Sequence, residues 1–409
     1  MKKLCTLTAL PLLFAVPLAA QEAEPEYVTP GSVVANAAPE EWVTIAPENL
    51  LVMELAPDSS GRARTVVIQL IPAPFSQPWV ENIRTLTEAH WWDGTSVNRV
   101  QDNYVTQWGD VTEEKPLPEG VVAPTADYEA DVEAVADATH DFGPPLPAYD
   151  ELPESVRQVF EDPNSTHEDH IRAIEMLIAE LGLDGSLGFN ASEQLAMLSI
   201  NTTQTRLTEQ GWHNRDGYAP WVEFWQGWPI ANEEVIVGWE DEEGNAVSDP
   251  GPRRPPHQFD PPYSNVESST FWPIHCYGYV GVGRGYAPDT GTGAELYTII
   301  GQPQRHMDRN LAVVGRIIEG MEHLSSLPRG SGDLGFYTDE EAHLRVPILS
   351  VRLGSELENS PAFEYLSTES ESFAQYVQIR ANRNDPFYTV PAGGVDVCSV
   401  QVPVRRVAE

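Results

Sequence analysis

The stretch "WWDGTSVNRVQDNYVTQWGD", residues 91–110, contains the pattern that decides the fold. Two short runs rich in β-branched and aromatic residues, 95–100 and 104–110, flank the trio "QDN". Asp and Asn favour turns because their side chains bond to the nearby backbone and tolerate unusual φ values. The segment therefore predicts a β-hairpin.

The same hairpin contains polar side chains among apolar ones. Because side chains alternate between the two faces of a strand, we expect Val97 and Arg99 to share one face, and Val105 and Gln107 to share one face of the partner strand. If the register brings these faces together, Arg99 and Gln107 lie side by side. Charged side chains are rarely buried without a partner, so Arg99 is the residue whose role needs an explanation.

The sequence around the hairpin predicts mainly strands. The segments "TVVIQL" (65–70), "AELYTIIG" (294–301) and "VPILSVRLG" (346–354) have the β-branched content of strands, and Pro78 lies near the first turn of a predicted helix. The intervening block 111–270 is acidic and rich in proline and tryptophan, and it contains two helical patterns. We expect a mainly β protein with a partly helical inserted subdomain.

Six segments occur in an order that matches a known family: "TVVIQL", "VENIRTL", "DGTSVNRVQDNYVTQWGD", "GTGAELY", "NLAVVGRIIEGMEHL" and "VPILSVRLG". Together they resemble the cyclophilin-type peptidyl-prolyl cis-trans isomerases, whose hairpin pattern is "F-H-R-V-I-x-x-F-x-x-Q-G-G-D". The resemblance implies a closed eight-stranded antiparallel barrel with two capping helices and a substrate groove on its outside. We therefore expect the chain to be organised in five parts. These are a signal peptide (1–20), an N-terminal extension (21–54), a discontinuous barrel (55–110 and 271–355), the acidic insertion (111–270) and a C-terminal extension (356–409).

The resemblance also implies roles for individual residues. Arg99 matches the family's catalytic arginine, and Gln107 matches its groove glutamine. Several positions depart from the family, including two tyrosines in place of phenylalanine, a glutamate in place of glutamine and a leucine in place of histidine. The substrate-binding positions that it implies are Tyr104, Val105, Glu295, Tyr297, His306, Met307 and Leu311.

The chemistry implied for Arg99 follows from the barrier to rotation about an X-Pro bond. Twisting the amide breaks its resonance and costs about 18–20 kcal/mol. In the twisted state the prolyl nitrogen regains a lone pair, which a guanidinium beside it can stabilise with a hydrogen bond that the planar amide cannot accept. The first interpretation is therefore an isomerase acting on proline-containing polypeptides in exported proteins. The alternative is a catalytically weak cyclophilin-like binding or chaperone module for such segments.

The composition limits the partners and the compartment. A formal net charge of −38 repels nucleic-acid phosphates and anionic lipid, so neither is an expected partner. Lys2 and Lys3 precede an apolar run that ends in small residues near Ala20, which is the pattern of a cleaved signal peptide. We expect a periplasmic or secreted protein that has no membrane anchor and is monomeric. Cleavage leaves Cys276 and Cys398, for which a disulfide and two free thiols are equally good explanations.

Two other motifs have simple structural explanations. The loop "GVGRGYAPDTGTG" (281–293) lacks the third glycine of a dinucleotide fingerprint, because Tyr286 occupies that place, and it predicts a surface loop. His167 and His170 are three residues apart, but no third metal ligand is evident, so we expect neither a metal nor a cofactor.

The tryptophan cluster of the insertion has two interpretations. Trp221, Trp225 and Trp228 could stack on sugars or peptides. At helical spacing such residues more often form a subdomain's own core, and we favour the core.

Overall fold

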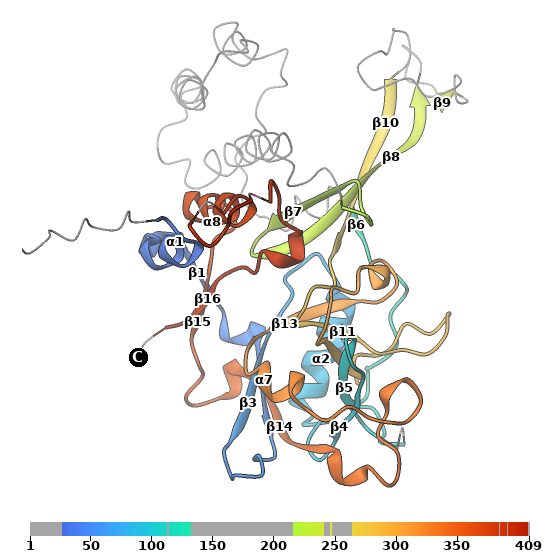
Figure 1. Ribbon diagram of the computed structural model, residues 1–409. Helices are drawn as coiled ribbons and strands as arrows, with labels where there is room; N and C mark the ends of the chain where they lie inside the picture. The colour runs from blue at the N-terminus through green and yellow to red at the C-terminus, as the bar shows by residue number, and fades with distance from the viewer. Residues whose placement is uncertain are drawn as a thin grey trace, which may run out of the picture.

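The computed structural model describes residues 27–112, 114–131, 216–240, 246–247, 264–383, 385–390 and 392–407. In this part of the chain, antiparallel strands close into an eight-stranded barrel in the order β11-β12-β5-β4-β14-β2-β3-β13 (Figure 1). The strands are β2 (Leu50–Leu55), β3 (Arg64–Leu70), β4 (Ser96–Val100), β5 (Val105–Gly109), β11 (Tyr279–Val282), β12 (Leu296–Ile299), β13 (Val313–Glu319) and β14 (Val346–Leu353). The predicted fold class, a mainly β protein built on such a barrel, is confirmed.

Strand β3 explains why one run of the sequence is apolar on both faces. Val66, Ile68 and Leu70 point into the barrel core, and each is at most 2% exposed. Val67 lies on the opposite face and is also fully buried, because it packs into a second apolar cluster. A strand covered on both sides loses the alternation of apolar and polar residues that a half-exposed strand shows.

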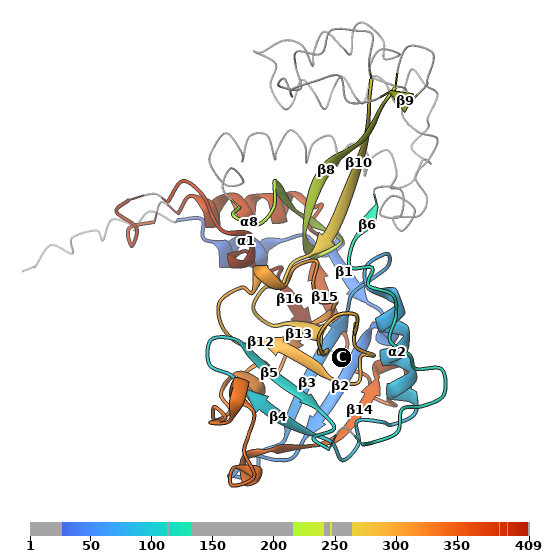
Figure 2. The same cartoon turned by 90° about the vertical axis from the view of Figure 1, so that its right-hand side faces the viewer.

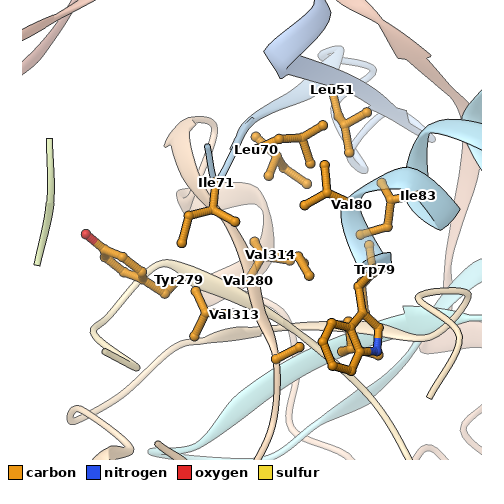
Figure 3. Close-up of a cluster of buried hydrophobic side chains, with 14 of the residues drawn as sticks. Leu51, Leu70, Ile71, Trp79, Val80, Ile83, Tyr279, Val280, Val313 and Val314 are labelled. Atoms are coloured by element: carbon orange, nitrogen blue, oxygen red, sulfur yellow. The ribbon is translucent and has the colours of Figure 1, made fainter. Parts of the chain in front are cut away.

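Two helices pack on the barrel core. Helix α2 (Gln77–Glu88) buries Val80 and Ile83, which point toward Leu51 and Leu70 (Figure 3). Helix α7 (Glu322–Ser325) is a single turn whose Leu324 is fully buried. Its Leu324 carbonyl accepts a hydrogen bond from Thr106 on β5 at 3.2 Å. The two capping helices implied by the resemblance therefore differ greatly in length.

The expected N-terminal extension (21–54) overlaps the barrel. Strand β2 begins at Leu50, so the barrel starts inside that range. Residues 42–45 of this range pair with the C-terminal extension (356–409) in a three-stranded sheet. The sheet contains β1 (Trp42–Ile45), β15 (Phe363–Leu366) and β16 (Val404–Arg406), and its helices α1 (Pro30–Asn36) and α8 (Glu371–Ala381) lie side by side (Figures 1 and 2).

This pairing could not be expected from local sequence. Trp42 pairs with Leu366 across more than three hundred residues, and the two ends of the chain share one apolar cluster. The local sequence of either segment does not specify which strand it pairs with, because a four-residue strand contains no pattern that identifies its neighbour in the sheet.

The described part of the insertion forms a five-stranded sheet rather than helices. Its strands are β6 (Ala130–Asp131), β7 (Trp221–Trp225), β8 (Trp228–Glu240), β9 (Ala246–Val247) and β10 (Ser264–Pro273). The long β8 and β10 pair with each other and extend away from the barrel (Figures 1 and 2). The helical patterns at 165–182 and 190–207, together with His167 and His170 and the signal-peptide range 1–20, lie outside the described residues.

The helical interpretation of the tryptophan spacing was wrong. Trp225 and Trp228 face each other across the tight turn between β7 and β8. Trp225 is 5% exposed and Trp228 is fully buried, so both belong to the core, as expected. The spacing misled because Gln226 and Gly227 form a turn with positive φ, which a helical count does not anticipate.

Two further expectations concern the cysteines and the glycine-rich loop. Cys276 and Cys398 form a disulfide with a Cα–Cα distance of 5.1 Å, which links the barrel to the C-terminal segment. Tyr286 in the loop 281–293 is 97% exposed, so this segment is a surface loop.

None of the helices in the described ranges is both long and apolar enough to cross a bilayer.

Candidate functional site around Arg99

A β-bulge determines which way Arg99 points. Val97 pairs with Trp108 and Arg99 pairs with Gln107, so Asn98 is an extra residue on β4. Val97 is fully buried in the barrel core, whereas Arg99 is only partly buried and lies on the outer side. The expectation that Val97 and Arg99 share a face was therefore wrong, because a bulge reverses the alternation beyond it.

The expected neighbour of Arg99 is confirmed. Arg99 Nη1 donates to Gln107 Oε1 at 3.0 Å. The other two bonds go to Gln101 Oε1 from Nη2 at 2.7 Å and to the Leu334 carbonyl from Nε at 2.7 Å. All three acceptors are uncharged, and Arg99 forms no ion pair with any residue that the structure describes.

Two aromatic rings flank the guanidinium. Its Cζ lies 5.5 Å from the ring centroid of Tyr104 and 5.3 Å from that of Phe336. Burial lowers the pKa of Arg99, although an arginine remains protonated in a protein at neutral pH. A guanidinium has five N–H donors and three are used here, so two donate to no acceptor in the described part of the structure. Arg99 is thus a fixed cation with donor capacity left at the surface.

An apolar cluster lies directly beside Arg99, and we call it the seat. Its buried members are at most 4% exposed, and its partly buried members form the outer edge. Val105 and Ile299 pair across β5 and β12, and Tyr297 pairs with Gln107, so these side chains share the outer face of the barrel. The seat consists of Val105, Tyr297, Ile299 and Met307, with Tyr104 and Leu311 packed against them.

The remaining residues expected at the site lie at its margin. His306 is exposed, and its ring stacks on Tyr104 with 6.3 Å between the ring centroids. Glu295 approaches Gln107, with 3.5 Å between Oε2 and Nε2. The structure therefore brings all nine predicted site residues together around one patch of the barrel surface.

A buried polar chain beneath the seat was not expected from the sequence. The Tyr297 hydroxyl lies 3.0 Å from His275 Nε2, and His275 Nδ1 lies 2.9 Å from Asp308 Oδ1. Burial raises the pKa of Tyr297 well above its ordinary value, so its hydroxyl remains neutral. The exchange of phenylalanine for tyrosine is thus accommodated, since the added hydroxyl has a buried partner.

Three contacts of Arg99 also escaped sequence reasoning. Gln101 could have been found by alternation, because it lies two residues beyond Arg99 on the same outer face. Leu334 and Phe336 come from a loop more than two hundred residues away, and no local signal connects that loop with β4.

The site contains no evident place for a metal. Within the described ranges, no group of three or more His, Cys, Asp or Glu side chains is arranged to hold a metal ion. What the arrangement can do is donate hydrogen bonds from a cation next to an apolar surface.

Among comparisons with known proteins, the one with solved structures found likenesses. No family model matches the sequence, and no curated protein matches it. A solved structure described as cyclophilin AquaCyp293 from Hirschia baltica is 20% identical, with a TM-score of 0.49, over 93% of this chain and 98% of that chain.

Proposed function

We propose that the chain is a peptidyl-prolyl cis-trans isomerase of the cyclophilin type that acts on exported proteins. The observation that carries the proposal is the position of Arg99, a cation held by neutral acceptors at the edge of the seat. An arginine locked to a carboxylate would have its charge neutralised, and one inside the barrel could not meet a substrate.

The roles follow from the geometry. Tyr104 and Leu311 provide the partly accessible edge of the seat, beside the buried Met307, against which a prolyl ring would pack. Arg99 would then donate a hydrogen bond to the prolyl nitrogen once the amide is twisted. Gln107 holds the guanidinium in place through its Oε1 atom. Since the planar amide cannot accept this bond, the interaction favours the transition state over the ground state.

The exported role has separate support. The N-terminal 20 residues have a signal-peptide pattern, and Cys276 and Cys398 form a disulfide of the kind that persists in oxidising compartments. Slow X-Pro isomerisation limits the folding of many proteins, so an isomerase would be useful in such a compartment.

A protease-free measurement tests the activity. The exchange rate between cis and trans forms of a short X-Pro peptide would be measured by NMR with the purified chain and with Arg99→Ala. We expect acceleration by the native chain and a rate close to that of buffer with the variant. Equal acceleration by both proteins would show that the reaction does not depend on Arg99.

One observation favours a second candidate, a binding module with weak catalysis. The four central residues of the seat are already nearly inaccessible, and the Tyr104 hydroxyl contacts Met307 Sδ at 3.1 Å. A prolyl ring would have to displace part of this contact. Peptide binding that shifts signals of the seat without any acceleration of exchange would support this candidate.

A further inference from the structure

The segment that supplies one wall of the seat is attached to the insertion (111–270) by ion pairs. Residues 304–311 connect β12 to β13 and include Met307 and Leu311. Arg305 and Arg309 stand two residues on either side of Met307. Arg305 pairs with one carboxylate, and Arg309 with two, from the chain between β5 and β11.

Arg305 makes the most buried of these contacts. Its side chain is 5% exposed, and that of Asp216 is 7% exposed. The pair is bidentate, with Nη1 to Oδ2 at 2.5 Å and Nη2 to Oδ1 at 3.1 Å. Arg305 Nε also donates to Asp308 Oδ2 at 2.6 Å. Burial alone would lower the pKa of Arg305, but the hydrogen bonds and charges of Asp216 and Asp308 outweigh it and raise the pKa overall.

Arg309 makes the second attachment. Its Nε donates to Glu129 at 2.5 Å and its Nη1 donates to Glu233 at 3.0 Å. Its Cζ lies 4.7 Å from the ring centroid of Trp272 on β10. The Arg309 side chain is 41% exposed, so this attachment is weaker than the one through Arg305.

A hydrogen-bonded chain links the first attachment to the floor of the seat. Asp308 accepts bonds at 2.9 Å from both the backbone N–H and Nδ1 of His275. The other ring nitrogen of His275, Nε2, lies 3.0 Å from the Tyr297 hydroxyl, so the imidazole bridges Asp308 and Tyr297. Asp216 is thus connected to Tyr297 through Arg305, Asp308 and His275.

We propose that the insertion (111–270) serves as an ionic clamp on the seat, in which Asp216, with Glu129 and Glu233, holds residues 304–311 so that Met307 and Tyr297 are positioned for a prolyl ring. This inference rests on the proposed isomerase function. The three acids are positioning residues, because they act through Arg305 and Arg309 and touch no substrate. Loss of Asp216 leaves a buried guanidinium with only one carboxylate, and the segment shifts to let water reach it.

The test compares Asp216→Asn with a matched control in the full chain. Asp93 and Arg352 form another bidentate pair, at 2.7 and 2.8 Å, and neither residue contacts the seat or residues 304–311. Asp93→Asn therefore removes the same charge from a bidentate pair elsewhere on the barrel, whose side chains are more exposed, at 32% for Asp93 and 22% for Arg352. Exchange kinetics of an X-Pro peptide would be measured for both variants, together with the melting temperature.

We expect Asp216→Asn to raise KM about tenfold while kcat falls less than about threefold, since misplacing a binding wall weakens substrate positioning. Asp93→Asn should leave both constants within about twofold of the native values. Arg309→Gln should raise KM by about threefold, because that pair is more exposed. If Asp216→Asn and Asp93→Asn have the same KM and kcat, the clamp is refuted.

A readout independent of activity separates this proposal from the isomerase proposal. Backbone hydrogen exchange of residues 304–311 should accelerate about tenfold or more in Asp216→Asn and remain native in Asp93→Asn. If the native chain fails to accelerate peptide exchange but this difference appears, the isomerase is wrong and the clamp stands as a structural device. If the native chain is active and residues 304–311 exchange identically in both variants, the isomerase stands and the clamp is wrong.

Discussion

Two arginines of the barrel, Arg99 on β4 and Arg316 on β13, have similar partners but different surroundings. Each donates to a glutamine side chain and a backbone carbonyl, and each lies over two aromatic rings. Arg316 bonds to Gln69 Oε1 at 2.9 Å and to the Gly227 carbonyl at 2.6 Å. Their hydrogen-bonding chemistry alone would not tell the two sites apart.

The difference lies in what covers them. Arg316 is 5% exposed, because the β7–β8 turn and Tyr365 of the three-stranded sheet lie over it. Arg99 lies where the barrel surface is not covered by either sheet, and its guanidinium remains partly exposed. The guanidinium of Arg316 therefore joins the barrel, the inserted sheet and the three-stranded sheet. The guanidinium of Arg99 is instead accessible from outside the barrel.

The largest expected effect is the loss of isomerase activity when Arg99, but not Arg316, is replaced. Arg99→Ala should lower kcat/KM for X-Pro exchange about 10²–10³-fold, equivalent to about 3–4 kcal/mol, because a donor aimed at the transition state is lost. The free energy of unfolding in urea should change by less than about 1 kcal/mol, since Arg99 is a surface residue. Arg99→Lys should recover little activity, because a lysine lacks the planar fork. A large loss of stability in Arg99→Ala would show that Arg99, like Arg316, is needed for the stability of the fold.

The reverse result is expected at the covered site. Arg316→Ala should destabilise the protein by about 3 kcal/mol, because it leaves a cavity and two buried acceptors without donors. Urea denaturation measures this loss. At temperatures where the variant is folded, kcat/KM should stay within about twofold of the native value. An activity loss as large as that of Arg99→Ala would mean that the two sites are coupled.

A smaller loss of stability is expected when the contact between the β7–β8 turn and Tyr365, which lie over Arg316, is disturbed. Gly227 has a φ of +84°, and a Cβ there would lie 2.7 Å from the Tyr365 ring. Gly227→Ala should therefore cost about 2 kcal/mol of unfolding free energy. Gly61→Ala is the control, since Gly61 has a φ of +83° and a Cβ there would meet nothing within 4 Å. Equal losses of unfolding free energy in the two variants would show that Tyr365 does not pack closely against the β7–β8 turn.

The smallest effect concerns the rings around Arg99. Phe336→Leu removes one of the two rings under the guanidinium, and a cation–π contact at a partly exposed site contributes about 0.5–1 kcal/mol. We expect kcat/KM to fall two- to fivefold by this estimate, with Phe336→Tyr close to native since the ring is kept. A normal rate in Phe336→Leu would leave Tyr104 as the only ring that matters.

By itself the sequence determined the barrel class, the hairpin around "QDN" and the neighbouring positions of Arg99 and Gln107. These follow from β-branched runs, turn chemistry and the ordered resemblance to a family, all of which are local or linear properties of the chain. It left open whether Cys276 and Cys398 pair, because the distance between two cysteines in space is not encoded in their spacing.

Only the tertiary structure decided which face Arg99 occupies and what holds the seat. The bulge at Asn98 reverses the predicted alternation, and a single extra residue leaves no clear mark in a five-residue strand. Phe336, Asp216 and the pairing of β1 with β15 depend on contacts between segments far apart in the chain. Such contacts form because packing brings together surfaces that no local pattern identifies, so the seat and its clamp appear only when the chain is folded.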